Sequence, residues 1–226
     1  MPQNAQASSH QRAILLLPGA VDFTHIQRYY PDWLIDSFVI AVDKGIDKAS
    51  HFPNGVDLWV GDFDSSEGLV VDAAHYGEKI PYPVDKDEID TELAIGMAIA
   101  RGVSEILILG GIGGRIDHQM ALLFLPVQYP EVQFQHTNGA QRMQYLHAGE
   151  NYKMPALFES LVSVIALTDL KGLTLSGVKW PLSDYTLPLG RGLTYSNRAL
   201  EETVSVVIET GSAWLYICEP EIDDSL

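Results

Sequence analysis

The sequence predicts an α/β fold, in which an N-terminal, mostly parallel, doubly wound sheet with helices on both faces precedes a C-terminal antiparallel β-sandwich. Between residues 12 and 136, short β-branched or leucine-rich runs alternate with helix-like segments. This alternation is typical of a parallel sheet covered on both faces. After Thr137 the helical period disappears, and short strand-like runs are separated by Gly, Pro, Asp and Asn. That second pattern is typical of an antiparallel sandwich.

Five strands and two helices are expected in the N-terminal part. The strands are the runs RAILLL, FVIAV, VDLWV, EILILG and VQFQH. The clearer helix lies between the third and fourth of these strands, and Gly102 provides its C-terminal stop. Its apolar stripe is expected to consist of Ile89, Leu93, Met97 and Ala100. The second helix is expected to run from Asp117 to about Leu125.

The C-terminal part is expected to form strands from LVSVIAL, GLTLSGVKW, TVSVVIE and SAWLYI. We place the boundary near Asn138, which gives an α/β domain over residues 1–138 and a β-sandwich domain over residues 139–226. The chain has 226 residues, 46% of them hydrophobic, and is long enough to fill both cores.

Charge and cysteine content exclude several classes of protein. Thirty acidic and fourteen basic residues give a net charge of -16, which repels nucleic acids and anionic membranes. The N-terminal residues lack the apolar centre of a secretory signal, and the single Cys218 excludes a disulfide within the chain. We therefore expect a cytoplasmic protein with no nucleic-acid or membrane partner.

Acidic residues follow the predicted strands at the points where these strands end. Asp43 follows FVIAV, Asp62 and Asp64 follow VDLWV, and Asp87 and Asp90 begin the clearer helix. Because ligands bind outside the carboxyl ends of the strands in such sheets, we expect these carboxylates to converge there. Asp62 and Asp64 are two residues apart, so in an extended backbone they project to one side and repel each other unless a cation neutralises them.

Each acid also has a purely structural explanation. Helix capping and the helix dipole favour acids in a first turn, and Asp43 suits a turn. No turn requires two acids on one side, so we favour a metal site for Asp62 and Asp64. Carboxylates without neighbouring His or Cys suit Mg²⁺ or Mn²⁺, which bind one or two acids together with waters and substrate phosphates.

The last predicted strand before the second helix runs into the glycine-rich segment GGIGGRIDH. Gly113 and Gly114 let the backbone approach a ligand, the following helix offers free amides to an anion, and Arg115 suits phosphate. The segment therefore resembles a phosphate-binding loop, although it is neither a P-loop nor a dinucleotide fingerprint. The structural alternative is a strand-to-helix turn in which Arg115 pairs with Asp117.

The order of three motifs resembles the thiamine pyrophosphokinase family. These motifs are GDFDS at 61–65, DKDEIDTELAI at 85–95 and GGIGGRIDH at 110–118, and GVKWPL at 177–182 and GRGLTYSN at 190–197 extend the likeness. The resemblance implies a Mg²⁺-dependent transfer of pyrophosphate from ATP to the hydroxyl of thiamine, with AMP as the other product. It also implies a homodimer in which each active site lies between two subunits.

The resemblance also assigns roles to individual residues. It implies that magnesium and the nucleotide phosphates are held by Asp62, Asp64, Asp87 and Asp90. We assign ATP or phosphate contacts to Asp43, Gly45, Gly113, Gly114, Arg115 and Asp117. Thiamine contacts from the partner's β domain are implied for Ser196 and Asn197. Trp180 and Trp214 are further candidates for thiamine contacts, although we expect both to fill the sandwich core.

The chain departs from the family pattern at two positions. Lys44 stands where a glycine is usual, so it either crowds the nucleotide or contacts a phosphate. Ile89 replaces a threonine, and as part of the apolar stripe it should change packing only. Phe63, between the two acids, is expected to point the other way and to pack in the core.

Two other functions remain open from the sequence. The first is an Asp-x-Asp metal-dependent glycosyltransferase or phosphatase that uses Asp62 and Asp64. The second is a non-catalytic thiamine or nucleotide sensor, because a fold alone does not fix function.

Overall fold

A computed structural model of the chain describes residues 11–63, 72–82 and 89–220. Its largest element is a ten-stranded sheet with the strand order β12-β9-β14-β7-β6-β5-β1-β2-β3-β4. Six neighbouring strands of this sheet are mutually parallel. They are β1 (Arg12–Leu16), β2 (Phe38–Val42), β3 (Val56–Gly61), β4 (Tyr76–Pro81), β5 (Glu105–Leu109) and β6 (Gln133–Thr137). This arrangement confirms the predicted parallel sheet and all five predicted strands, and adds β4.

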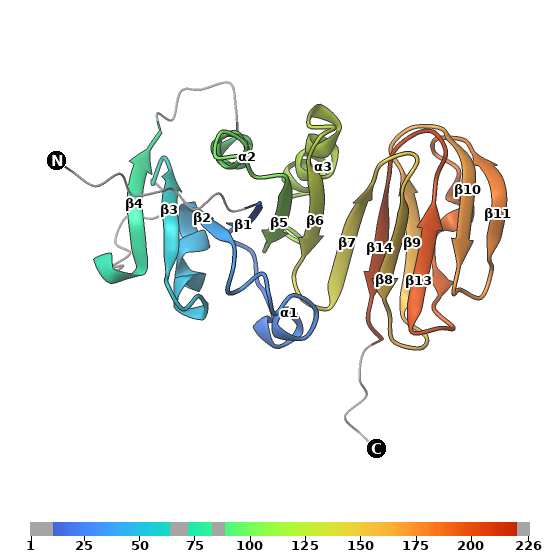
Figure 1. Cartoon of the computed structure of the whole chain (residues 1–226), viewed down its shortest axis with the longest axis horizontal. Coiled ribbons are helices and arrows are strands. Elements are labelled where there is room, and N and C mark those ends of the chain that lie inside the picture. The colour runs from blue at the N-terminus through green and yellow to red at the C-terminus, as the bar shows by residue number, and fades with distance from the viewer. Residues whose placement is uncertain (1–10, 64–71, 83–88, 221–226) are drawn as a thin grey trace, which may run out of the picture.

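Helices cover both faces of the parallel strands, as the sequence predicts (Figure 1). Side chains alternate along β1, so Ala13 and Leu15 contribute to one core while Ile14 and Leu16 contribute to the other. The first core is covered by α2 (Asp90–Ile99) and α3 (Ile116–Phe124), and the second by α1 (Phe23–Tyr29) and the 3₁₀ helix η1 (Asp43–His51). Shorter 3₁₀ segments are η3 (Ala73–His75), η4 (Leu125–Gln128) and η5 (Gly192–Thr194).

The C-terminal half forms a β-sandwich, which confirms the second part of the predicted fold. One layer continues the large sheet with antiparallel strands, namely β7 (Gln141–Leu146), β9 (Leu161–Ala166), β12 (Asn197–Arg198) and β14 (Ala213–Cys218). The other layer has the order β11-β10-β13-β8. Its strands are β8 (Asn151–Pro155), β10 (Leu170–Ser176), β11 (Leu182–Leu187) and β13 (Thr203–Val207). The two layers enclose a separate core that includes Val164, Leu173 and Leu215.

The boundary near Asn138 falls in the turn between β6 and β7. These two strands are hydrogen-bonded to each other, with His136 opposite Met143. The sheet therefore runs through both halves of the chain without interruption. The division into residues 1–138 and 139–226 stays a prediction about the domains, while the backbone hydrogen bonds join them.

The predicted apolar stripe of the clearer helix is wrong, although the helix itself and its stop are confirmed. The buried residues of α2 are Thr91, Ala94, Ile95 and Ala98. Ile89 is 39% exposed, so it does not belong to the packed face. Of the predicted stripe, Met97 packs half-buried against this core, while Ala94, Ile95 and Ala98 form the buried face. Gly102 has a φ of 86°, the left-handed conformation of a helix stop.

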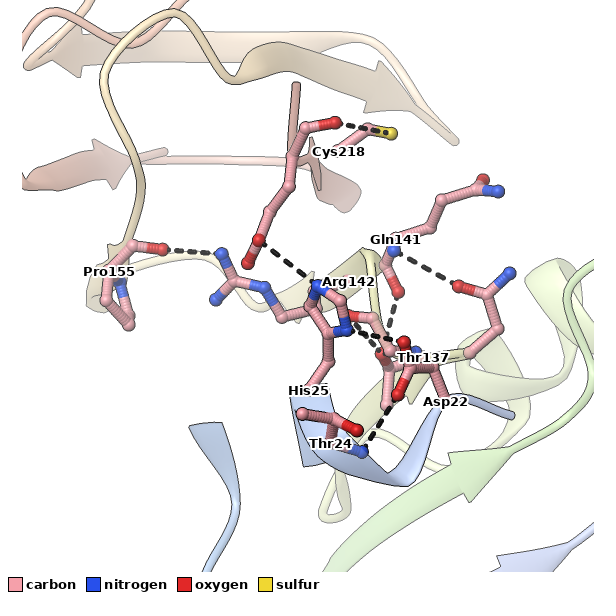
Figure 2. A network of polar contacts seen from close by, with 11 residues as sticks. Asp22, Thr24, His25, Thr137, Gln141, Arg142, Pro155 and Cys218 are labelled. Carbon is pink, nitrogen blue, oxygen red and sulfur yellow. Dashed lines mark hydrogen bonds and ion pairs between the residues drawn. The ribbon is translucent and has the colours of Figure 1, made fainter. Parts of the chain in front are cut away.

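A polar network ties α1 to the region where the two halves of the sheet meet (Figure 2). Asp22 caps α1 by accepting a hydrogen bond from the amide of Thr24 at 2.8 Å. His25 contacts Asp22 at 2.9 Å and the buried Glu219 at 3.3 Å. The hydrogen bond with His25, followed by that with Thr24, lowers the pKa of Asp22. Because Glu219 directly follows β14, the network joins the first helix to the end of the sandwich.

The buried side chain of Arg142 adds a second link at the same place. Its guanidinium lies 3.7 Å from the ring centroid of Tyr29 and donates to the carbonyl of Pro155 at 2.8 Å. α1, β7 and β8 are thereby held together by one side chain. Within the described residues, no helix is both long and apolar enough to cross a membrane.

Trp214 anchors α3 on the sheet, and its replacement tests the fold directly. Its indole is fully buried and donates to the carbonyl of Leu123 at 2.9 Å. We predict that Trp214→Phe lowers the free energy of unfolding by about 2 kcal/mol, because a buried hydrogen bond and packing volume are lost. The matched variant Trp180→Phe, on a side chain that is 57% exposed, should change it by less than about 0.5 kcal/mol. Equal effects in urea denaturation would contradict this account of the core.

Candidate functional site

Three of the predicted carboxylates converge at the carboxyl edge of the parallel sheet. Asp43 follows β2 directly, Asp62 follows β3, and Asp90 is the first residue of α2. Burial, then the charges of Asp90 and Asp62, raise the pKa of Asp43 to about 6. A hydrogen bond with Asp90 also favours the protonated form of Asp43. The electrostatic coupling places the three acids in one group, as the strand-end argument predicts.

The backbone around Asp43 is held in an uncommon conformation. Asp43 has a φ of 48° and Phe63 a φ of 64°, both in the left-handed region. The indole of Trp59 donates to the carbonyl of Asp43 at 2.9 Å and fixes this turn. A Cβ on Gly61 would lie 1.9 Å from Oδ1 of Asp43, so only glycine leaves room for the carboxylate there. Such strain at a strand end is typical of functional sites.

One carboxylate oxygen of Asp43 has no partner. Oδ1 is buried and accepts no hydrogen bond from any residue that the structure describes. A buried, unpaired oxygen among like charges is unfavourable and attracts a cation or a donor. Among the described residues, the group of acids therefore lacks a partner for this oxygen and is suited to a positively charged ligand.

Phe63 confirms its predicted role as a packing residue. Its ring lies 4.9 Å from that of Trp59 in an edge-on arrangement, and it packs against the core on the α1 side of the sheet. The ammonium of Lys79 lies 4.0 Å from the Phe63 centroid. The ring anchors the loop in which Asp62 lies.

The predicted metal ligands are only partly within the described residues. Asp64 and Asp87 lie outside them, while Asp62 and Asp90 lie inside. In the described ranges, no group of three or more His, Cys, Asp or Glu side chains is arranged to hold a metal ion. The four-aspartate set therefore stays a prediction.

Gly45 has a structural reason to be glycine. It is buried in η1, and a Cβ there would lie 1.8 Å from the carbonyl oxygen of Leu16. The ammonium of Lys48, also in η1, donates to the carbonyl of the next residue, Leu17, at 2.9 Å. Lys44 is exposed, so its proposed contact with a phosphate stays a prediction.

The glycine-rich loop is exposed and leads into α3. Gly113 and Gly114 have φ values of 105° and 79°, and neither has a neighbour that a side chain would meet. The guanidinium of Arg115 donates two hydrogen bonds to the carboxylate of Asp117, and this contact lowers the pKa of Asp117. The structural alternative, pairing of Arg115 with Asp117, is therefore present in the fold. Binding of phosphate by this loop stays a prediction.

The four candidate thiamine contacts differ sharply in exposure. Ser196 is exposed with a φ of 60°, and its amide donates to the hydroxyl of Ser163 at 3.1 Å. Trp180 is 57% exposed, so the expectation that it fills the core is wrong. Trp214 is fully buried, which leaves its ring no surface for a ligand, but it lies in the core under α2 and α3, so the expectation that it fills the sandwich core is wrong.

The side chain of Asn197 holds the backbone of Trp180 in place. Its amide oxygen accepts from the Trp180 amide at 3.1 Å, and its amide nitrogen donates to the Trp180 carbonyl at 2.9 Å. The oxygen also accepts from the amide of Arg198. The buried Asn197 is therefore hydrogen-bonded to the backbone of Trp180 and Arg198, while the indole of Trp180 stays exposed to solvent.

The two groups of candidates lie far apart within one chain. β12, which carries Asn197, and β2, which precedes Asp43, are separated by seven strand spacings in the sheet order. At about 4.8 Å per spacing, this corresponds to roughly 34 Å along the sheet. The acids and the exposed tryptophan of one chain cannot contact the same small molecule.

Comparison with known families matches both halves of the chain. The catalytic domain of thiamin pyrophosphokinase matches residues 31–137, and the vitamin B1 binding domain of thiamin pyrophosphokinase matches residues 149–215. The chain belongs to the thiamin pyrophosphokinase family. Both matched segments lie on either side of the turn between β6 and β7.

Relatives and solved structures of the family agree with this assignment. Thiamine pyrophosphokinase of Bacillus subtilis (strain 168) is 29% identical over 147 residues, 62% of this chain and 68% of that protein. Thiamine pyrophosphokinase 2 of Arabidopsis thaliana is 27% identical over 170 residues, 70% of this chain and 64% of that protein. The crystal structure of a thiamin pyrophosphokinase family protein from Enterococcus faecalis has a TM-score of 0.73 and 25% identity, covering 93% of this chain and all of the other.

Two contacts that hold the Asp43 turn could not be predicted from the sequence motifs of the chain. Trp59 lies inside a strand and reads as a core residue, yet its indole nitrogen fixes the Asp43 turn. Gly61 reads as part of the acidic motif, yet it makes room for a different aspartate. The only signal for either is their position next to the acids.

Asp43 predicts a pH dependence of stability. Its folded-state pKa of about 6 lies above the ordinary 3.8, so the folded protein binds this proton more tightly than the unfolded chain. The contribution of protonated Asp43 to the free energy of unfolding is thus fully present at low pH. It is lost as the pH rises through about 6, because the carboxyl then ionises in the folded protein. Without divalent cations, we predict that Asp43→Asn raises the free energy of unfolding by about 1 kcal/mol at mildly alkaline pH, a value reduced for partial exposure.

The same comparison at a pH below the ordinary pKa of aspartate supplies the control. There the gain should vanish, because Asp43 is protonated in both states. The exposed Asp32→Asn should show no such pH-dependent gain. An Asp43→Asn effect that is independent of pH in urea unfolding would contradict the raised pKa of Asp43.

Proposed function

We propose that this protein catalyses the transfer of pyrophosphate from ATP to the hydroxyl of thiamine, yielding thiamine diphosphate and AMP. The observation that carries the proposal is the group of coupled carboxylates at the carboxyl edge of the sheet, in a chain that both family domains match. The relatives named above carry thiamine pyrophosphokinase as their name. Neither a glycosyltransferase or phosphatase nor a sensor is favoured by these comparisons.

Mg²⁺ is the cofactor that the donor set fits. Asp62, Asp64, Asp87 and Asp90 would hold the ion, and the unpaired Oδ1 of Asp43 lies in the same group. Carboxylate oxygens alone suit a hard cation. When bound, the ion would neutralise phosphate charge and the mutual repulsion of the acids.

The chain's own residues would position ATP and neutralise charge, since pyrophosphoryl transfer requires little covalent chemistry from the protein. The amides at the start of α3 and the open backbone at Gly113 and Gly114 would bind phosphate oxygens. Arg115 would exchange its contact with Asp117 for a phosphate and stabilise developing negative charge. The thiamine hydroxyl would attack the β-phosphorus in line, and a carboxylate at this edge would accept its proton.

The acidic edge also suits the acceptor, because the thiazolium ring of thiamine carries a positive charge. Trp180 would stack on a ring of thiamine, with its backbone held by Asn197. Ser196, exposed beside it, would contact the same substrate.

A homodimer would bring these two groups together. Roughly 34 Å separates them along one sheet at about 4.8 Å per strand, so a second copy must supply Trp180 to the acids of the first. Two apolar surfaces support such pairing. One follows α3 and η4 and consists of Ile116, Met120, Phe124 and Val127, and the other surrounds Trp180 and includes Leu193, Tyr195 and Leu200. A two-fold axis would place each surface of one copy against the other surface of its partner.

A cytoplasmic location belongs to the same proposal. The chain has a single cysteine, which is free, and the substrates named above are small molecules.

The products of the reaction test the proposal. Phosphorus NMR of the protein with ATP, Mg²⁺ and thiamine should show AMP formed in step with thiamine diphosphate, and ADP as the nucleotide product would contradict it. Asp62→Asn should lower kcat by about a hundredfold or more, because a ligand for the phosphate-neutralising ion is lost. Asp32→Asn, at an exposed acid away from the strand ends, should leave kcat unchanged.

Mixed dimers test whether two copies share a site. Co-expressed Asp62→Asn and Trp180→Ala chains should regain activity that neither variant has alone, because a mixed dimer holds one intact site. Random pairing predicts about a quarter of the wild-type activity. Asp62→Asn with Asp90→Asn is the control and should regain none, since both lesions lie on the same side of the site. Recovery in the control, or none in the first pair, would contradict the shared site.

A further inference from the structure

A cavity of about 170 Å³ lies between α3 and the large sheet, where parallel strands give way to antiparallel ones. Its walls come from α3, from the segment after β5, and from β6, β7, β9 and β14. No residue assigned above to ATP, metal or thiamine lines it. We call this cavity the His136 pocket.

The walls of the His136 pocket are mostly apolar. Ile112, Leu123, Met143 and Ile165 supply its apolar side chains. Besides His136, the polar side chains are uncharged amides and a phenol: Gln119 and Gln141 line the pocket, and the hydroxyl of Tyr216 donates to Gln141 at 3.1 Å. The walls therefore offer no charge to an ionic ligand.

His136 is the unusual member of the wall. It is 2% exposed, and neither of its ring nitrogens has a hydrogen-bond partner among the described residues. Burial lowers its pKa to about 4, so the imidazole is neutral at physiological pH. A Cβ on Gly111 would lie 2.4 Å from Nε2, which shows how closely the loop after β5 covers the ring. Buried polar atoms of this kind are rare without a partner, because each costs about 1–3 kcal/mol.

We propose that the His136 pocket binds a neutral, single-ring nitrogen heteroaromatic compound. Its size suits one ring, because an apolar protein cavity of about 150 Å³ accommodates benzene. The apolar walls favour the faces of such a ring. The ring nitrogen or a substituent on it would supply the hydrogen bond that His136 lacks.

Pyridine is the probe for this proposal, and the wild-type protein with ¹⁵N-labelled histidine is the sample. The ring signals of His136 are assigned by their absence from His136→Gln. They should shift and saturate as pyridine is added at neutral pH, while the signals of the other histidines stay in place. Benzoate, a charged ring of similar size, should produce no shift at His136. An unmoved His136 signal at saturating pyridine would overturn the proposal.

Ile165→Trp supplies an independent measurement because it fills the pocket from β9. Pyridine should bind this variant at least about tenfold more weakly, equivalent to about 1.4 kcal/mol. Ile35→Trp, on a side chain that is 73% exposed and outside the pocket, should bind it as the wild type does. Unchanged binding by a folded Ile165→Trp would place pyridine elsewhere and overturn the proposal. The binding assay needs neither ATP nor thiamine, so its outcome is separate from that of the proposed function.

Discussion

The hydrogen bonds between β6 and β7 are the constraint on which the rest of the structure depends. They join a parallel sheet, whose carboxyl edge gathers acids, to antiparallel strands that form one layer of a sandwich. Because backbone pairing fixes the order of all ten strands, it also fixes how far the acids of Asp43 and Asp62 lie from Trp180. The polar network of His25, Arg142 and Glu219 strengthens the same joint. The strand order of one chain therefore keeps the acids and Trp180 apart along the sheet.

The fold holds Asp43, Asp62 and Asp90 together although their negative charges repel one another. Asp43 lies half-buried beside Asp62 and Asp90, in a left-handed turn that Trp59 and Gly61 stabilise. A protein selected for stability alone would not place like charges there, and such costs are typical of functional sites. The same group becomes favourable once a cation is added. Under the proposed function, a bound cation would offset this repulsion.

The strand-end acids, the fold class and the packing role of Phe63 were predictable because each depends on local periodicity. The face of α2 was not, since Ile89 and Ala94 are both apolar and only tertiary contact with the sheet decides between their two stripes. The exposure of Trp180 was not predictable either, because it depends on hydrogen bonds to Asn197 from a distant strand. Sequence spacing likewise says nothing about the empty space beside His136. Long-range packing supplied what local pattern could not.

The most direct test of the shared site uses Mn²⁺ as a paramagnetic substitute and fluorine-labelled tryptophan as the reporter. Paramagnetic broadening falls steeply with distance from the ion, and Trp59 lies beside Asp43 in the same chain. We expect the ion to broaden the fluorine signals of both Trp59 and Trp180 in the assembled protein, and to leave that of the buried Trp214 sharper. A broadened Trp59 signal with an unaffected Trp180 signal would show that the acids and the exposed indole never meet, and would contradict the account.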